Sequence, residues 1–212
     1  MKRVLGVLSG NDMPLAQIEA WARSAEVVLA ADGGANALEQ LGIRADAAIG
    51  DFDSITTAAR QRPLETVYDP DQDRSDCDKL LAFAAGRGYE AITLCNIEGD
   101  RLDHVLATLH SAARSSLTVR LALRRGLGLV LKGECEATFT AVPGETLSLL
   151  PLETCEQVSL TGVGWPLSNQ QLSPQGKTSL SNQVSAERIS VKIESGSAVL
   201  ILTATRLAQP TW

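Results

Sequence analysis

The sequence lacks a long hydrophobic run, a basic patch and closely spaced cysteine pairs. No stretch reaches the roughly 18 apolar residues that a membrane-spanning helix needs. The densest basic spot is Arg124-Arg125, and the net charge of −6 argues against a nucleic-acid surface, which needs clustered Lys and Arg. The apolar fraction of 44% is typical of a soluble globular protein, and 212 residues allow one large domain or two small ones.

Cysteine usage and the N-terminus favour a cytoplasmic protein. The cysteines form no C-x-x-C pair and lie far from both histidines in sequence, so a structural zinc site is not expected. We interpret them as free, mostly buried thiols in a reducing compartment. Residues 1–8 are basic and then apolar, like a signal peptide, but polar residues 9–12 end the apolar run too early for one. The four cysteines are Cys77, Cys95, Cys135 and Cys155.

Strand and helix patterns alternate through about the first 125 residues. This alternation predicts βαβ units and a parallel sheet with helices on both faces, an α/β architecture. Ligands of such sheets bind beyond the carboxyl ends of the strands. The expected strands are residues 4–8, 26–31, 45–49, 66–68 and 91–95, and the expected helices are residues 15–23, 35–41, 76–87 and 102–114.

From about residue 128 no helix-length periodicity appears. Short apolar runs alternate with turn signals such as Pro143-Gly144 and Ser195-Gly196. This pattern predicts a small antiparallel β-sandwich or barrel, so we expect one domain over residues 1–128 and a second over 129–212. The expected strands of the second domain are residues 127–131, 137–142, 146–150, 157–160, 189–193 and 197–203.

Two acidic clusters, residues 50–54 and 71–76, each follow a predicted strand. Because alternate residues of an extended segment point the same way, Asp51 and Asp53 can converge on one point, and Asp71 and Asp73 can do the same. Carboxylates this close repel unless a cation or protons neutralise them, and oxygen ligands in this number suit Mg²⁺, which in enzymes usually also contacts phosphates. For residues 50–54 the alternative is a polar turn with solvated carboxylates. A D-x-D motif also occurs in glycosyltransferases and phosphatases, so it indicates a metal more than a reaction.

The second cluster leads into a predicted helix. Ser75 with Asp78 three residues later resembles a capping box, which puts Asp76 in the first helical turn and Lys79 one turn further along. Alternatively, Asp76 and Asp78 only complement the helix dipole. We accept that interpretation for Asp78, and we keep Asp73 and Asp76 as candidate site residues because they border the strand end.

Two further motifs fall at the same predicted sheet edge. Asp32-Gly33-Gly34 opens a helix, either as a phosphate-binding turn or as a plain turn capped by Asp32. Arg101 can clamp a polyphosphate, because a guanidinium matches phosphate oxygens bidentately. Asp103 and His104 can orient Arg101 or transfer protons. A lone His is more often structural than catalytic, and we interpret His110, further along the same predicted helix, as structural.

The C-terminal half offers one aromatic and one polar candidate. Trp165, in the turn-rich segment 162–167, is either a small core anchor or a ring that stacks on a flat ligand. Ser181 and Asn182 carry short polar side chains that can bond a heterocycle.

In this order the motifs resemble the thiamine pyrophosphokinase family. The resemblance runs through nearly the whole chain and implies an α/β nucleotide-binding domain followed by an antiparallel β-sandwich. It implies a homodimer with active sites in clefts between subunits. The implied reaction is transfer of a pyrophosphoryl group from ATP to the thiamine hydroxyl, giving thiamine diphosphate and AMP. The residues that carry the resemblance are 31–36, 50–54, 71–76 with Lys79, 101–104, 162–167 and 181–182.

The resemblance also implies roles for individual residues. The hypothesis assigns Mg²⁺ to three aspartates with Asp76 assisting, and assigns neutralisation of the polyphosphate to Arg101 and Lys79. It assigns stacking on a thiamine ring to Trp165 and the pyrimidine edge to Ser181 and Asn182. The family resemblance further implies that Trp165 serves the active site of the partner subunit. The magnesium ligands are Asp51, Asp53 and Asp73. The expected ATP contacts are Asp32, Gly33, Gly34, Asn36, Ser54, Gln72, Lys79, Asp103 and His104.

The chain departs from the family pattern at three places. Asp100 stands where the family usually has the second of two glycines, Ser75 stands where Thr is usual, and the residues before Ser181-Asn182 differ. Two alternatives stay open. One is a Mg²⁺-dependent phosphohydrolase or nucleotidyltransferase that uses the same acidic edge. The other is a non-catalytic nucleotide- or thiamine-binding module, an alternative that Asp100 keeps open.

Overall fold

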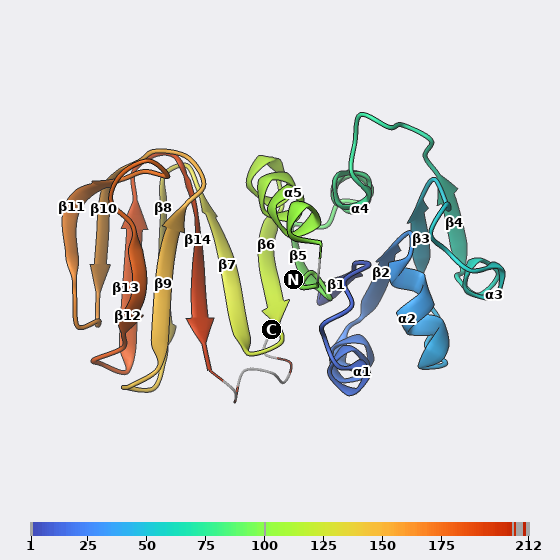
Figure 1. Cartoon of the computed structure of the whole chain (residues 1–212), viewed down its shortest axis with the longest axis horizontal. Helices are drawn as coiled ribbons and strands as arrows, with labels where there is room; N and C mark the ends of the chain where they lie inside the picture. Colours follow the sequence, from blue (N-terminus) through green and yellow to red (C-terminus); the bar gives the residue numbers. More distant parts are fainter. Residues whose placement is uncertain (1, 100, 205, 207–209, 211–212) are drawn as a thin grey trace. The chain divides into compact units, whose positions relative to one another are not determined.

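The computed structural model describes residues 2–99, 101–204, 206 and 210, and it divides into two compact units (Figure 1). The first unit is Met1–Arg124 with Arg206–Trp212, and the second is Arg125–Thr205. The second unit therefore begins at Arg125, a few residues before the boundary after residue 128 that we expected from the sequence. Within the described residues, no helix combines the length and the apolar character needed to cross a membrane.

The first unit is built on a six-stranded parallel sheet in the order β6-β5-β1-β2-β3-β4. Every residue of β1, β2, β3 and β5 is buried, as expected for a parallel sheet covered on both faces. The prediction of an α/β fold is thus confirmed. The strands are β1 (Val4–Val7), β2 (Val27–Ala31), β3 (Ala47–Gly50), β4 (Glu65–Tyr68), β5 (Ala91–Cys95) and β6 (Thr118–Leu123).

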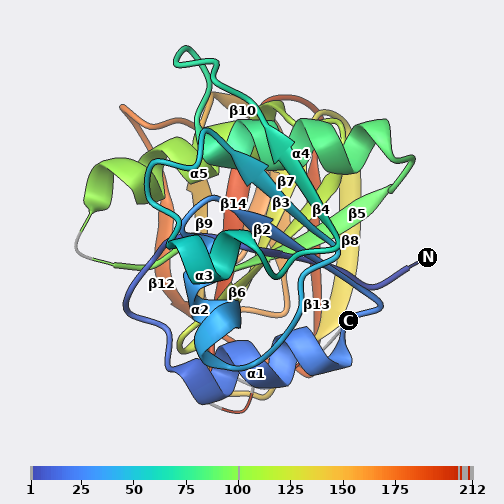
Figure 2. The ribbon, with the colours of Figure 1, turned by 90° about the vertical axis from the view of Figure 1, so that its right-hand side faces the viewer.

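Helices cover both faces of this sheet (Figure 2). Helices α4 and α5 pack together on one face, where α4 contacts β2 and β3, and α1 and α2 lie on the other. Trp21 of α1 is completely buried and anchors that layer. The helices are α1 (Leu15–Ser24), α2 (Gly34–Gln40), α3 (Thr57–Arg60), α4 (Asp76–Gly86) and α5 (Leu102–Arg114).

The second unit holds two antiparallel sheets, β12-β9-β14-β7 and β11-β10-β13-β8. Buried and exposed residues alternate along several strands, as in sheets packed face to face around a shared core. The antiparallel architecture predicted here is also confirmed. The strands are β7 (Gly126–Lys132), β8 (Cys135–Thr140), β9 (Thr146–Pro151), β10 (Cys155–Thr161), β11 (Leu167–Leu172), β12 (Ser179–Gln183), β13 (Arg188–Ile193) and β14 (Ser197–Thr203).

Four elements escaped the sequence analysis: α3, β6, β11 and β12. Helix α3 has only four residues, and β11 and β12 are rich in Ser, Asn and Gln rather than β-branched residues. The cysteines are all free, and three of the four are buried, which confirms the prediction of free, mostly buried thiols.

Candidate active site

Asp32 directly follows β2, and its backbone has an uncommon conformation. Its φ of 40° lies in the left-handed region that non-glycine residues rarely adopt, and the residue is fully buried. Gly50, at the end of β3, makes room for it, because a Cβ there would lie 2.8 Å from the Asp32 Cβ. Asp32 Oδ2 accepts a hydrogen bond from Ser54 N at 3.1 Å, whereas Oδ1 is buried with no hydrogen-bond partner among the described residues.

Asp51 and Asp53 converge through a turn rather than through an extended segment. Strand β3 ends at Gly50, and Phe52 adopts a φ of 64°, so the strand geometry that we expected from the sequence is wrong here. The Phe52 ring turns inward, where it contacts Tyr68 at a centroid distance of 6.1 Å and lies 4.8 Å from the Arg60 guanidinium. Burying the ring leaves the two flanking carboxylates on the outer side of the loop.

Three carboxylates meet at this sheet edge. One carboxylate oxygen from each of Asp32, Asp51 and Asp53 lies within 4.8 Å of the other two. Burial, with smaller contributions from the charges of Asp76 and Asp53, raises the pKa of Asp32 to about 6 despite the hydrogen bond from Ser54. A buried oxygen without a partner and three clustered carboxylates fit a divalent cation that prefers hard oxygen ligands, such as Mg²⁺.

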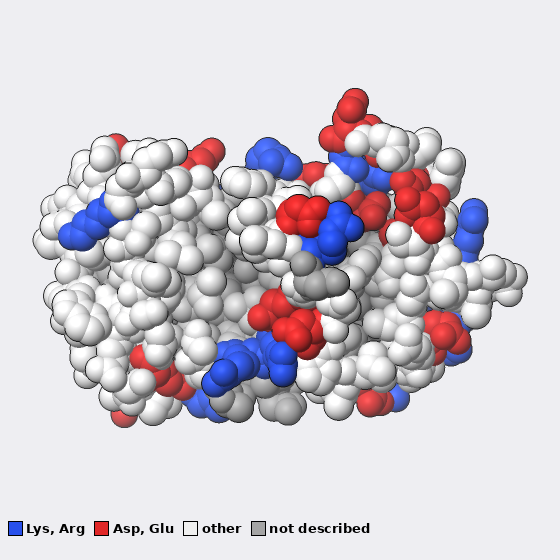
Figure 3. All heavy atoms as spheres, in the orientation of Figure 1, with Lys and Arg blue, Asp and Glu red and all other residues white. Residues whose placement is uncertain are grey.

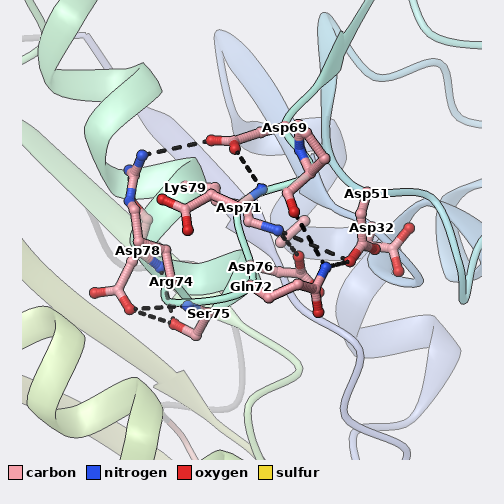
Figure 4. Close-up of polar contacts among 12 residues, drawn as sticks. Asp32, Asp51, Asp69, Asp71, Gln72, Arg74, Ser75, Asp76, Asp78 and Lys79 are labelled. Atoms are coloured by element: carbon pink, nitrogen blue, oxygen red, sulfur yellow. Dashed lines mark hydrogen bonds and ion pairs between the residues drawn. The ribbon is translucent and has the colours of Figure 1, made fainter.

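Gln72 and Lys79 hold Asp51 in place (Figure 4). Gln72 Nε2 donates to Asp51 Oδ2 at 2.8 Å, and Lys79 Nζ lies 4.0 Å from the same oxygen. The Gln72 hydrogen bond is the main cause that lowers the pKa of Asp51, and Lys79 adds to it. In the space-filling view, acidic side chains gather over the region of α4 and β3 (Figure 3).

Lys79 is a buried cation, since only 2% of its side chain is exposed. Its Nζ lies 3.5 Å from Asp76 Oδ1, and burial raises the pKa of Asp76 although Lys79 opposes that shift. Lys79 is therefore the counter-ion of Asp51 and Asp76 in this structure. Its predicted contact with a polyphosphate stays a prediction.

Asp71 and Asp73 do not belong to the three-carboxylate group. Asp71 N donates to Asp69 Oδ1 at 3.1 Å, and Asp73 N donates to Asp71 Oδ1 at 2.9 Å. The side chains of Asp69 and Asp71 therefore accept hydrogen bonds from the backbone of their own loop. Asp73 is exposed and instead lines a hollow of about 620 Å³ between α4 and α5, together with Arg74 and Arg114. Asp73 stays a predicted magnesium ligand that this geometry leaves outside the group.

The predicted capping box at the start of α4 is confirmed. Ser75 Oγ accepts from Asp78 N at 3.1 Å, and Asp78 Oδ2 accepts from Ser75 N at 3.1 Å. Arg114 also donates to Asp78 at 3.0 Å. Burial alone would raise the pKa of Asp78, but hydrogen bonds from Ser75 and Ser111 lower it overall. Asp78 therefore stabilises the helix terminus, as we inferred from the sequence.

Asn36 and Ser54 fix the loop that carries Asp53. Asn36 Nδ2 donates to Ser54 O at 2.9 Å, and its Oδ1 accepts from Thr56 N at 2.8 Å. Ser54 Oγ donates to Asp53 Oδ1 at 2.8 Å. Both residues, expected as ATP contacts, thus position an acidic side chain in this structure.

Close packing requires glycine at position 34 and leaves little room for a side chain at position 33. A Cβ on Gly34 would lie 2.1 Å from Val7 O of β1, and a Cβ on Gly33 would lie 3.0 Å from Ser9 Oγ. Helix α2 can therefore approach the sheet only with glycine at its first residue. This packing explains the glycine whether or not the turn binds a phosphate.

Arg101 and Asp103 form a bidentate pair at the start of α5. Arg101 Nε and Nη2 donate to the two Asp103 oxygens at 3.0 and 2.7 Å, and both side chains are largely exposed. The hydrogen bonds from Arg101 are the main cause that lowers the pKa of Asp103 to about 2. His104 is exposed on the same turn. The departure from the family pattern at Asp100 lies outside the described residues.

The sequence analysis named Arg101 after β5 but missed Asn96 and Gly10, in the loops that directly follow β5 and β1. Strands β1 and β5 are neighbours, but β2 lies on the far side of β1 and β6 lies on the far side of β5. The strand order therefore reverses between β1 and β5, and open α/β sheets bind ligands at such a point. Asn96 has a φ of 56°, and its buried Oδ1 has no hydrogen-bond partner among the described residues. A Cβ on Gly10 would lie 2.2 Å from Asn96 O. The turn at residues 9–12 was visible in the sequence, but only the strand order reveals its place.

The second unit brings Trp165, Ser181 and Asn182 together. Trp165 is 67% exposed, which excludes the core-anchor interpretation. Asn182 is only 2% exposed and bonds the main chain of Trp165 through both its amide oxygen and its amide nitrogen. Ser181 is exposed, and its N–H donates to Ser148 Oγ at 3.0 Å.

Comparison with known proteins supplies two family models. The model "Thiamin pyrophosphokinase, catalytic domain" matches residues 18–122, and the model "Thiamin pyrophosphokinase, vitamin B1 binding domain" matches residues 135–200. Together they span most of the chain in the order in which the two units occur.

A curated relative and solved structures agree with these matches. Thiamine pyrophosphokinase of Bacillus subtilis is 27% identical over 180 residues, which are 80% of this chain and 84% of the relative. The crystal structure of thiamine pyrophosphokinase from Bacillus subtilis matches with a TM-score of 0.77 at 24% identity. The match covers 95% of this chain and 99% of the Bacillus subtilis chain. Thiamin pyrophosphokinase from Candida albicans has a TM-score of 0.79 at 18% identity, with 96% and 89% covered. At such identities the structural matches establish the fold.

Proposed function

The chain belongs to the thiamine pyrophosphokinase family, and we propose that it transfers a pyrophosphoryl group from ATP to the hydroxyl of thiamine, giving thiamine diphosphate and AMP. The observation that carries this proposal is the acidic group of Asp32, Asp51 and Asp53, which lies within the part of the chain matched by the catalytic-domain model. Transfer from a nucleoside triphosphate depends on neutralising charge and aligning reactants more than on covalent help from the protein.

Mg²⁺ is the cofactor that fits this group. Asp51 and Asp53 would hold it with Asp32, whose Oδ1 has no hydrogen-bond partner among the described residues. When bound, Mg²⁺ would neutralise charge on the phosphates of ATP. The side chains of Gln72 and Lys79 keep Asp51 ionised and oriented for this task.

The chain's other residues would orient the two substrates. Arg101 presents a planar guanidinium to the polyphosphate, and its bidentate bond to Asp103 fixes that plane. Trp165 would stack on a thiamine ring, and Ser181 would bond the pyrimidine edge. The thiamine hydroxyl would then attack the β-phosphorus in line, with AMP as the leaving group.

The organisation of the enzyme is part of the same proposal. Residues 1–128 would bind ATP and residues 129–212 thiamine, in agreement with the order of the two family models. The enzyme would work in the cytoplasm as a homodimer in which Trp165 serves the partner's site. Exposed Leu102 and Leu106 on α5 give the first unit an apolar surface that a second chain could cover. Light scattering coupled to size-exclusion chromatography tests the dimer.

The decisive experiment is product analysis. Purified protein is incubated with ATP, Mg²⁺ and thiamine, and the products are resolved by chromatography. We expect thiamine diphosphate and AMP in equal amounts, and neither after EDTA is added. Free phosphate with ADP would indicate a phosphohydrolase, released pyrophosphate a nucleotidyltransferase, and binding without turnover a non-catalytic module. Glu65→Gln, which changes an exposed acidic residue at the start of β4 that pairs with Arg87, serves as the matched control for variants of the acidic group.

A further inference from the structure

The main chain of Trp165 is fixed although its ring is exposed. Gly164 N donates to Gln183 O at 2.7 Å, and Ser185 N donates to Gly162 O at 2.8 Å. Val163 and Val184 form an antiparallel bridge between the two segments. The loop that carries the indole is thus bonded along its length to the end of β12, while 67% of Trp165 itself stays exposed.

Asn182 completes this attachment and uses its whole side-chain amide to do so. Its Oδ1 accepts from Trp165 N at 3.0 Å and from Gln183 N at 2.9 Å. Its Nδ2 donates to Trp165 O at 2.7 Å and to Ser179 Oγ at 3.2 Å. An Asn amide offers two acceptor positions and two donors, so no bonding capacity is left for a ligand.

The backbone of β12 is shaped to turn Asn182 inward. The pairing of β12 with β9 shifts register between Ser179 and Asn182, and Ser181 has a φ of 53°. As a result Leu180 and Ser181 are both exposed, and Asn182 is buried. An irregularity of this kind commonly re-aims a side chain beside a binding site.

We propose that Asn182 is a positioning residue, which fixes the peptide groups of Trp165 so that the indole is held ready for the flat, cationic ring system of thiamine. This inference rests on the proposed function and changes the role that the family resemblance implied for Asn182, which was a direct bond to the substrate. An aromatic ring attracts a cation above its face, and a ring fixed before binding loses less freedom when the ligand arrives. Asn182 acts entirely through Trp165 and does not contact the substrate.

A double-mutant cycle separates the two roles. We expect Trp165→Ala to raise the KM for thiamine by about tenfold and to leave the KM for ATP unchanged. Asn182→Ala should raise the KM for thiamine in the same direction, and the double variant should be no worse than Trp165→Ala alone. If Asn182→Ala raises the KM for thiamine further in the Trp165→Ala background, Asn182 contacts the substrate and the proposal is overturned.

A second measurement does not depend on turnover. Asn182→Asp keeps the shape of the side chain and the acceptor for Trp165 N but removes both donors. It therefore breaks the bond to Trp165 O without opening the cavity that Asn182→Ala leaves. In a Trp212→Phe background, we expect both Asn182 variants to lower the fluorescence anisotropy of the exposed indole, whereas Trp21 stays buried and constant. Gln171→Ala removes an exposed amide of the same unit and is the matched control.

The outcomes of the two measurements are distinct. Unchanged anisotropy in folded Asn182 variants overturns the positioning role, whatever the activity. If the wild-type protein makes no thiamine diphosphate, the proposed function and thiamine as the ligand of Trp165 are both overturned. Lower anisotropy with a non-additive cycle supports the proposal.

Discussion

Replacing Asp32 by Asn should stabilise the metal-free protein while it impairs the proposed reaction. The side chain is fully buried, and its only described hydrogen bond is the one from Ser54 N to Oδ2. Asn has nearly the same shape, and its amide oxygen can keep that bond. The substitution therefore removes a buried charge without opening a cavity.

The expected size follows from the pKa of Asp32, which burial raises from 3.8 to about 6. Because the folded-state pKa is raised, ionisation of Asp32 opposes folding: the cost is absent below pH 3.8, grows as the pH rises to 6 and is complete above it. The full shift corresponds to about 3 kcal/mol, and about half of that is present at pH 5. For a chain of this length, the full cost is about 6–12 °C in Tm.

Thermal unfolding in EDTA at pH 5 and pH 8 measures the effect. We expect Asp32→Asn to unfold at a higher temperature than the wild type at pH 8, with a smaller gain at pH 5. Added Mg²⁺ should stabilise the wild type more than the variant, because it binds the folded carboxylate group. The control Glu65→Gln, which breaks an exposed ion pair, should shift stability by less than about 1 kcal/mol. An Asp32→Asn protein that is equally or less stable than the wild type at pH 8 would refute this reasoning.

Three further substitutions test the candidate site and its support. Asp53→Asn should lower thiamine diphosphate formation by orders of magnitude while circular dichroism and Tm show a folded protein. Gly34→Ala should destabilise the fold by about 1–3 kcal/mol in chemical denaturation, because its Cβ would lie 2.1 Å from Val7 O. Lys79→Met should cost about 1–3 kcal/mol in EDTA, because it leaves the partly exposed carboxylates of Asp51 and Asp76 without their counter-ion.

Matched controls make each of these results interpretable. Gly86→Ala lies in α4 with nothing within 4 Å of the new Cβ, so it should be neutral or slightly stabilising. Arg23→Met breaks an exposed pair with Glu19 at 2.8 Å and should cost less than about 1 kcal/mol. Near-normal turnover in folded Asp53→Asn would remove the metal assignment. Equal effects of Gly34→Ala and Gly86→Ala would show that the contact with Val7 does not decide the effect of the substitution.

The sequence predicted the sheet because burial determined its pattern. Continuous apolar runs at β1, β2 and β5 are the signature of strands covered on both faces, and all three appear with bounds that match to within a residue or so. The capping box at Ser75 and Asp78 was equally predictable, since its bonds join residues three apart. Local chemistry and periodicity were sufficient for these features.

The site was predictable only in part, because its assembly depends on contacts between distant segments. Asp51 and Asp53 were found from their spacing, yet Asp32 joins them only because β2 and β3 are neighbours. Asp73 has the same D-x-D spacing and lies outside the group, since hydrogen bonds within its loop direct it elsewhere. Spacing therefore identifies candidate ligands, and strand order selects among them.

Four residues at the candidate sites share a property that the sequence analysis did not predict, a left-handed backbone conformation without glycine. Asp32, Phe52, Asn96 and Ser181 all have positive φ, and each follows a strand or interrupts one at a candidate site. Such a conformation costs on the order of 1–3 kcal/mol, so the surrounding structure must impose it. At Phe52 the buried ring supplies that stabilisation, and the same turn directs two carboxylates outward. Because the stabilising contacts come from residues distant in sequence, no local pattern could have shown where the chain would turn.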